Sequence, residues 1–157
     1  MDERLSNPKI LWREATCLQR KFNTKLSIRE MKIVLTPEES ENIFYNSLCN
    51  GHSLSYMGLS INYDDGQYQK AKQVLKDKGE SPCLEDVWME MLRQGYTLTL
   101  VDEESGEDPA IITLADVHNR VADTDVRHLM DAINEHDDST TAEVILQQVF
   151  YGQVIFG

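Results

Sequence analysis

The chain has 157 residues, of which 41% are hydrophobic and 27% charged, and its formal net charge is −12. That length fits one domain, and the apolar content argues against intrinsic disorder. The acidic balance disfavours direct binding to nucleic acid and to anionic membrane surfaces, because both attract basic proteins. No apolar run approaches the roughly 20 residues that cross a bilayer.

The N-terminus and the cysteines indicate the expected compartment. No apolar signal-peptide core follows Met1. Cys17, Cys49 and Cys83 are sparse and widely spaced, which matches neither a disulfide framework nor a metal-binding motif. The sequence therefore predicts a cytoplasmic protein whose cysteines are reduced.

The charge is divided unevenly along the chain. Residues 1–30 hold seven Lys and Arg residues against four Asp and Glu residues, a net charge of +3. Residues 31–157 hold the remaining 8 basic and 23 acidic residues, a net charge of −15. We therefore interpret residues 1–30 as a basic N-terminal extension, either partly ordered or unordered, and residues 31–157 as a single acidic α+β domain. Met31 is either the start of a domain that follows a functional basic arm, or a natural start site preceded by a dispensable extension.

The predicted elements begin directly after this boundary. Residues 32–35 resemble a strand, and Thr36 followed by Pro37 and Glu39 predicts a capped helix that ends near Gly51. Residues 59–63 alternate apolar and polar side chains, which predicts a half-buried strand. A short helix is expected before Gly79.

The second half of the chain predicts helices around a hairpin. The apolar stripe behind Ser81 and Pro82, which includes Trp88, indicates an amphipathic helix, and such a stripe is more typical of a core than of a cofactor site. Residues 96–113 predict an antiparallel hairpin with a long acidic tip. Three further helices follow, broken near residues 123–125 and 136–139. The predicted fold class is therefore α+β, with a small, mostly antiparallel sheet packed by about five helices.

The acidic tip of the hairpin is a candidate cation site. Five of the seven residues Asp102–Asp108 are acids, and Asp102, Glu104 and Asp108 are the candidate ligands because divalent cations prefer carboxylate oxygens. The order of residues does not match an EF-hand loop. A solvated turn is the competing interpretation, because turns are commonly acidic and exposed.

The region from His118 to Asp138 is a candidate catalytic or metal site. It combines three histidines with several aspartates, and helical spacing places His128 on one face with Asp125 and Asp131. His128 and Asp131 are the candidate catalytic residues, because a carboxylate can orient an imidazole base. No tight zinc spacing is present, and aspartates near helix starts are also expected from capping alone.

No phosphate loop, dinucleotide-binding glycine motif, nucleophile elbow or CxxC pair occurs, so no cofactor is predicted. The leading hypothesis is a non-enzymatic accessory or protein-interaction domain whose partner presents a basic surface. Two alternatives are a metal-assisted hydrolase that uses the His118–Asp138 region, and a nucleic-acid mimic that inhibits a basic nucleic-acid-binding protein.

The C-terminal segment 153–157 contains the apolar run Val154–Phe156. Such a segment is expected to be buried, either as an added strand or packed under a helix. Pairing with a second copy is a further alternative, which makes this segment the candidate contact of a homo-oligomer.

Overall fold

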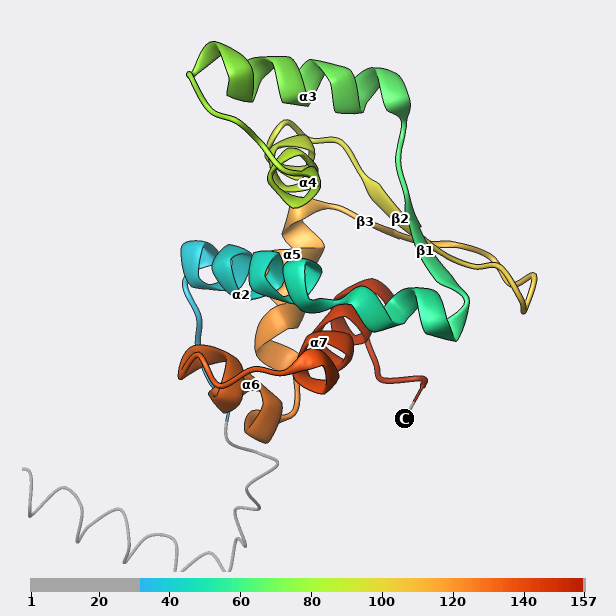
Figure 1. The fold of residues 1–157 in the computed structure, drawn as a ribbon. Coiled ribbons are helices and arrows are strands. Elements are labelled where there is room, and N and C mark those ends of the chain that lie inside the picture. The colour runs from blue at the N-terminus through green and yellow to red at the C-terminus, as the bar shows by residue number, and fades with distance from the viewer. Residues whose placement is uncertain (1–31, 157) are drawn as a thin grey trace, which may run out of the picture. The chain divides into compact units, whose positions relative to one another are not determined.

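The computed structural model describes residues 32–156, and Figure 1 shows a small sheet beside the helices, with the tip of its hairpin projecting away from them. The predicted α+β class is confirmed: six α-helices and two 3₁₀ helices accompany a three-stranded antiparallel sheet in this range. The predicted basic extension, residues 1–30, lies outside the described residues.

The first helix, α2 (Pro37–Asn50), begins at the predicted cap. Thr36 Oγ1 accepts a hydrogen bond from the Glu39 amide at 3.1 Å, and the Glu39 carboxylate accepts one from the Thr36 amide at 2.7 Å. This capping box satisfies two amides that the helix leaves unpaired.

The strand predicted at residues 32–35 is wrong, because the segment is irregular. Its alternation is real: Ile33 and Leu35 pack against the core, whereas Val34 is 90% exposed. Within residues 32–156, no neighbouring strand supplies ladder partners, and alternation without partners does not make a strand.

The sheet has the order β1–β2–β3, with strands Leu59–Asn62, Leu98–Asp102 and Ala110–Ile112. Strands β2 and β3 form the predicted hairpin, and β1 pairs antiparallel with the other side of β2. Leu59 lies opposite Asp102, and Ile61 lies opposite Leu100. Since β2 is central, β1 is an edge strand.

The helices pack against this sheet and against one another. The 3₁₀ helix η3 (His52–Met57) leads into β1, and α3 (Asp65–Asp77) packs on α4 (Leu84–Arg93). Helix α4 begins later than the Ser81–Pro82 pair suggested, and Cys83 is its N-cap residue. After the sheet come α5 (Leu114–Arg120), η4 (Val121–Asp123), α6 (Val126–Ile133) and α7 (Ser139–Tyr151).

Helix α7 lies in the middle of the core and contacts α2, α5, α6 and β3. Its buried side chains include Ile145 and Leu146, which are both fully covered. Leu98, Leu100 and Ile112 are also fully covered, so one face of the sheet packs on the helices. The opposite face remains partly open, because Ile111 is 59% exposed. No helix within residues 32–156 has the length and apolar character needed to cross a membrane.

The C-terminal segment packs along α7 rather than adding a strand. The buried Gln147 side chain accepts hydrogen bonds from the amides of Ile155 (2.8 Å) and Phe156 (2.7 Å). Its Nε2 donates to the Phe156 carbonyl at 3.0 Å, and the Phe156 ring meets Tyr151 edge-on. Val154 and Ile155 are about half exposed. Self-association through residues 153–157 stays a prediction.

Candidate binding groove along strand β1

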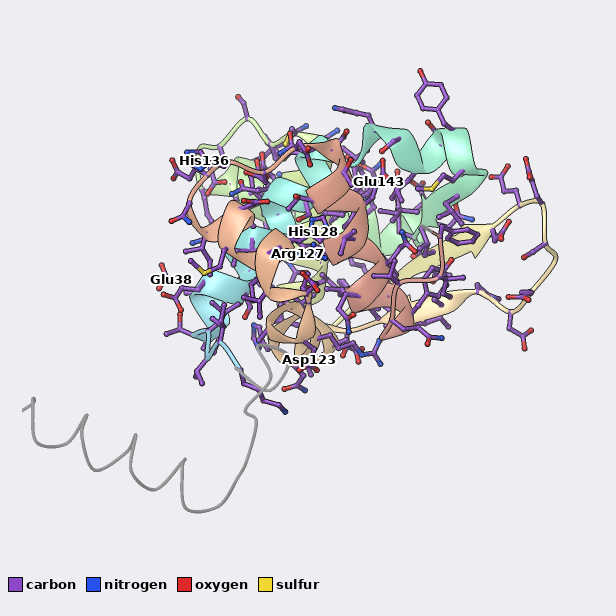
Figure 2. The ribbon with its side chains drawn as sticks, turned by 90° about the horizontal axis from the view of Figure 1, so that it is seen from below. Glu38, Asp123, Arg127, His128, His136 and Glu143 are labelled. Carbon is purple, nitrogen blue, oxygen red and sulfur yellow. The ribbon has the colours of Figure 1, made fainter. Side chains whose placement is uncertain are left out.

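The predicted catalytic pair lies on α6 and is not assembled into a reactive centre. His128 Nδ1 lies 3.1 Å from Thr141 Oγ1 of α7, which orients the imidazole between the two helices (Figure 2). Asp131 is exposed. The observed hydrogen-bond partner of His128 is therefore a hydroxyl group on another helix, and a catalytic role for His128 and Asp131 stays a prediction.

The other histidines of this region point to different neighbours. His118 Nε2 lies 2.9 Å from Glu41 Oε1 of α2. His136 lies in the exposed turn after α6, away from His128 in Figure 2. Asp138 caps α7 by accepting a hydrogen bond from the Thr141 amide at 2.8 Å, and this bond holds the pKa of Asp138 below its usual range. The region therefore divides into separate structural contacts.

Asp102, one of the three predicted cation ligands of the hairpin tip, makes local turn bonds. Asp102 Oδ1 accepts from the amides of Ser105 and Glu104, each at 3.0 Å, and these bonds lower the pKa of Asp102. Glu104 and Asp108 are exposed. Within residues 32–156, no three His, Cys, Asp or Glu side chains converge in a way that would hold a metal ion.

A groove of about 310 Å³ lies between η3, β1 and α4. Along the chain, η3 and β1 connect α2 to α3, and α4 follows α3 (Figure 1). Most of its wall is apolar, including Leu54, Leu84, Trp88 and Leu146. Leu59 and Ile61 of β1 also line it. These residues come from positions spread over more than 90 residues of sequence, so no local pattern predicts the groove.

The free edge of β1 runs along this groove. The Glu103 amide donates to the Gly58 carbonyl at 3.0 Å, which makes this an inward-facing pair between β1 and β2. Antiparallel pairing alternates, so the amides and carbonyls of Leu59 and Ile61 face outward. Among the described residues, neither residue has a backbone or side-chain partner on that side. The groove is therefore bordered by an unpaired strand edge.

Trp88, which lines the groove, also carries an unpaired donor that is itself buried. Its side chain is 8% exposed, and its indole Nε1 has no hydrogen-bond acceptor within the described part of the chain. The ring packs edge-on against Tyr63 with 5.9 Å between centroids. The sequence predicted Trp88 as a core residue, which is correct for its burial but missed its position at the groove.

Acidic residues surround the open edge of β1. Glu85 lines the groove, and Glu103 Oε1 accepts a hydrogen bond from Ser60 Oγ at 2.9 Å. A Cβ atom placed on Gly58 would lie 3.0 Å from Glu104 Cγ, so the Glu104 side chain covers the start of the strand. Asp64 and Asp65 follow its far end. None of the eight Lys and Arg residues in positions 32–156 lines the groove.

A larger groove of about 430 Å³ lies between α2, α6 and the segment Ile33–Leu35. Its wall includes Ile133 and the carboxylates of Glu39 and Glu135. No strand edge borders it, and none of the buried unpaired polar atoms found in residues 32–156 belongs to its lining. It therefore gives less indication of what could bind there than the groove along β1 does.

Comparison with known proteins assigns no family to this chain. No family model matches the sequence, and neither a curated protein nor a solved structure is significantly similar to it.

Proposed function

We propose that this chain is a non-enzymatic protein-interaction domain that binds a basic segment of a partner protein in the groove along β1. The single observation that carries the proposal is the coincidence of an unpaired strand edge, an apolar wall and acidic surroundings at one place. Each feature alone is common on protein surfaces. Together they match what a peptide-binding site requires, namely backbone partners, a pocket and charge complementarity.

The charge distribution supports a basic partner. Glu85, Glu103 and Glu104 lie at the groove or at the start of β1, and Asp64 and Asp65 lie beyond its end. Exposed carboxylates contribute little to affinity individually, but together they raise the association rate of a basic segment and disfavour acidic ones. The binding is therefore expected to weaken as salt is added.

The test uses two charge-reversal variants of the full chain that change net charge equally. Glu85→Lys with Glu103→Lys alters the β1 groove, whereas Asp131→Lys with Glu135→Lys alters the region of the larger groove. Affinity capture at low ionic strength identifies bound proteins, and titration calorimetry then measures each purified protein. A basic protein that binds the wild type and the second variant, but binds the first variant at least about tenfold more weakly, supports the proposal. Equal binding to both variants, or capture of no basic protein by the wild type, overturns it.

A further inference from the structure

We propose that the partner segment binds as an added strand: an extended peptide of alternating apolar and basic residues pairs with the outer edge of β1. This inference rests on the proposed function and specifies how the groove is used. The backbone of β1 supports this mode of binding. The amides and carbonyls of Leu59 and Ile61 point away from β2. Because Leu59 is only 3% exposed, the accessible donor and acceptor for an incoming extended chain are the amide and carbonyl of Ile61.

The two faces of β1 offer an added strand different surroundings, one apolar and one polar. Leu59 and Ile61 point to the face that packs on the helices, next to the apolar wall formed by Leu54 and Trp88. Ser60 and Asn62 point to the opposite face, where Ser60 bonds the Glu103 carboxylate. Because side chains alternate along a strand, the incoming peptide would place every second residue in the apolar groove and the others near carboxylates.

In the unbound protein, an exposed edge of β1 carries a risk of unwanted pairing. Native proteins usually shorten, charge or cover an exposed strand edge, because it invites pairing with other chains. Strand β1 has only four residues, and its ends are flanked by acids. These acids disfavour binding of a second acidic chain, including another copy of the acidic domain. They favour a strand that carries positive charge, so the same residues protect the edge and select its occupant.

The probe is a capped heptapeptide that alternates lysine and valine and begins and ends with lysine. Binding is followed by titration calorimetry and by the fluorescence of Trp88 in a Trp12→Phe background, which leaves one tryptophan in the chain. We expect saturable binding and a change in Trp88 emission. A peptide of the same composition with its valines in one block should bind at least about tenfold more weakly, because it cannot fill the groove with alternate residues.

Backbone methylation tests the pairing itself. Two versions of the heptapeptide carry N-methyl groups on alternate amides, one set shifted by one residue from the other. In strand addition, only one set faces β1, so one version should lose at least about tenfold in affinity while the other is nearly unchanged. Equal loss or equal retention in the two versions overturns strand addition.

A variant of the protein provides the reciprocal test. Ile61→Pro removes an outward amide of β1 but leaves the inward pairs of Ser60 and Asn62 with β2 available, whereas Ile61→Val keeps the amide. The proline variant should bind the probe at least about fivefold more weakly than the valine variant. Equal binding by the two variants overturns the proposal. If the proline variant does not fold, the two methylated peptides still decide the matter.

The outcomes separate this inference from the proposed function. Loss of probe binding, together with capture of a basic protein that depends on Glu85 and Glu103, overturns strand addition and leaves the proposed function standing. Absence of both overturns both. A concentration-dependent dimer of the wild type that Ile61→Pro abolishes, detected by analytical ultracentrifugation, would instead identify a second copy as the occupant of the edge and overturn the inference.

Discussion

The carboxylate of Glu41 in α2 lies 2.9 Å from Nε2 of His118 in α5, although 77 positions separate the two residues. Its other oxygen accepts a hydrogen bond from Arg93 Nε of α4, also at 2.9 Å. Glu41 is 16% exposed at its side chain, so one half-buried carboxylate joins three helices. Burial by itself raises the pKa of Glu41, but the hydrogen bonds and charges of His118 and Arg93 outweigh it, and the pKa lies below its ordinary value of 4.5.

Glu41→Gln should therefore destabilise the protein near neutral pH, by about 1 kcal/mol, because the Arg93 partner is partly solvated. A depressed carboxyl pKa contributes stability that is present above the unfolded-state value and is lost as pH falls through the folded-state value. The difference between wild type and variant should accordingly persist down to about pH 5 and shrink towards about pH 3. Urea denaturation across this range measures it.

The control for this experiment is Glu107→Gln, because Glu107 is an exposed acid of the hairpin tip whose side chain has no hydrogen-bond partner within the described residues. It should change stability little at any pH in the range. A loss of stability in Glu41→Gln that stays constant down to about pH 3 would show that the ion pairs are not responsible.

Gln147→Leu should release the C-terminal segment from α7. The side chain of Gln147 supplies both acceptor and donor to the backbone of Ile155 and Phe156, and it is 1% exposed. We expect a loss of about 2 kcal/mol in unfolding free energy, together with faster proteolysis after Tyr151. Gln148→Leu is the matched control, because Gln148 is an adjacent glutamine whose single bond to the Gly152 carbonyl is exposed. Similar loss in both variants would contradict the role assigned to Gln147.

Gly58→Ala should destabilise the turn that leads into β1. Gly58 has φ of 71°, a left-handed conformation, and an added Cβ would lie 3.0 Å from Glu104 Cγ. The cost should be about 1–2 kcal/mol in thermal or urea unfolding. Gly106→Ala tests the conformational part alone, because φ is 65° there and nothing lies within 4 Å of the added atom. A cost at Gly58 no larger than at Gly106 would show that the Glu104 contact is not tight.

Cys83 should react slowly with alkylating reagents at neutral pH, although it is exposed. Burial of the sulfur atom raises its pKa above the ordinary 9.0, and hydrogen bonding to the Asp86 and Glu85 side chains favours the protonated thiol further. The thiolate is the reactive form, so the rate with iodoacetamide should rise through a midpoint above 9.0. Peptide mass spectrometry measures the rate at this site. A midpoint below that of N-acetylcysteine would contradict the expectation.

The sequence predicted the fold class because its signals are local. The Thr36 capping box and the apolar stripes require only neighbouring residues, and the hairpin over residues 96–113 joins two strands that are close in the chain. These features appear in the structure as predicted. The strand predicted at residues 32–35 is wrong because a local pattern of alternation indicates which side chains are buried. It does not indicate whether a neighbouring strand is present to form a ladder.

Those local sequence patterns did not predict the candidate groove. The sequence indicated that residues 59–63 form a half-buried strand and that Trp88 is buried, but not that β1 occupies the edge of the sheet. Likewise, it associated the histidines with nearby aspartates, whereas His118 meets Glu41 and His128 meets Thr141. Apart from residues 32–35, periodicity and capping therefore predicted the main helices and strands by themselves. Long-range packing alone decided which strand edge stays unpaired and which side chains surround it, because those contacts join residues that no short-range pattern relates.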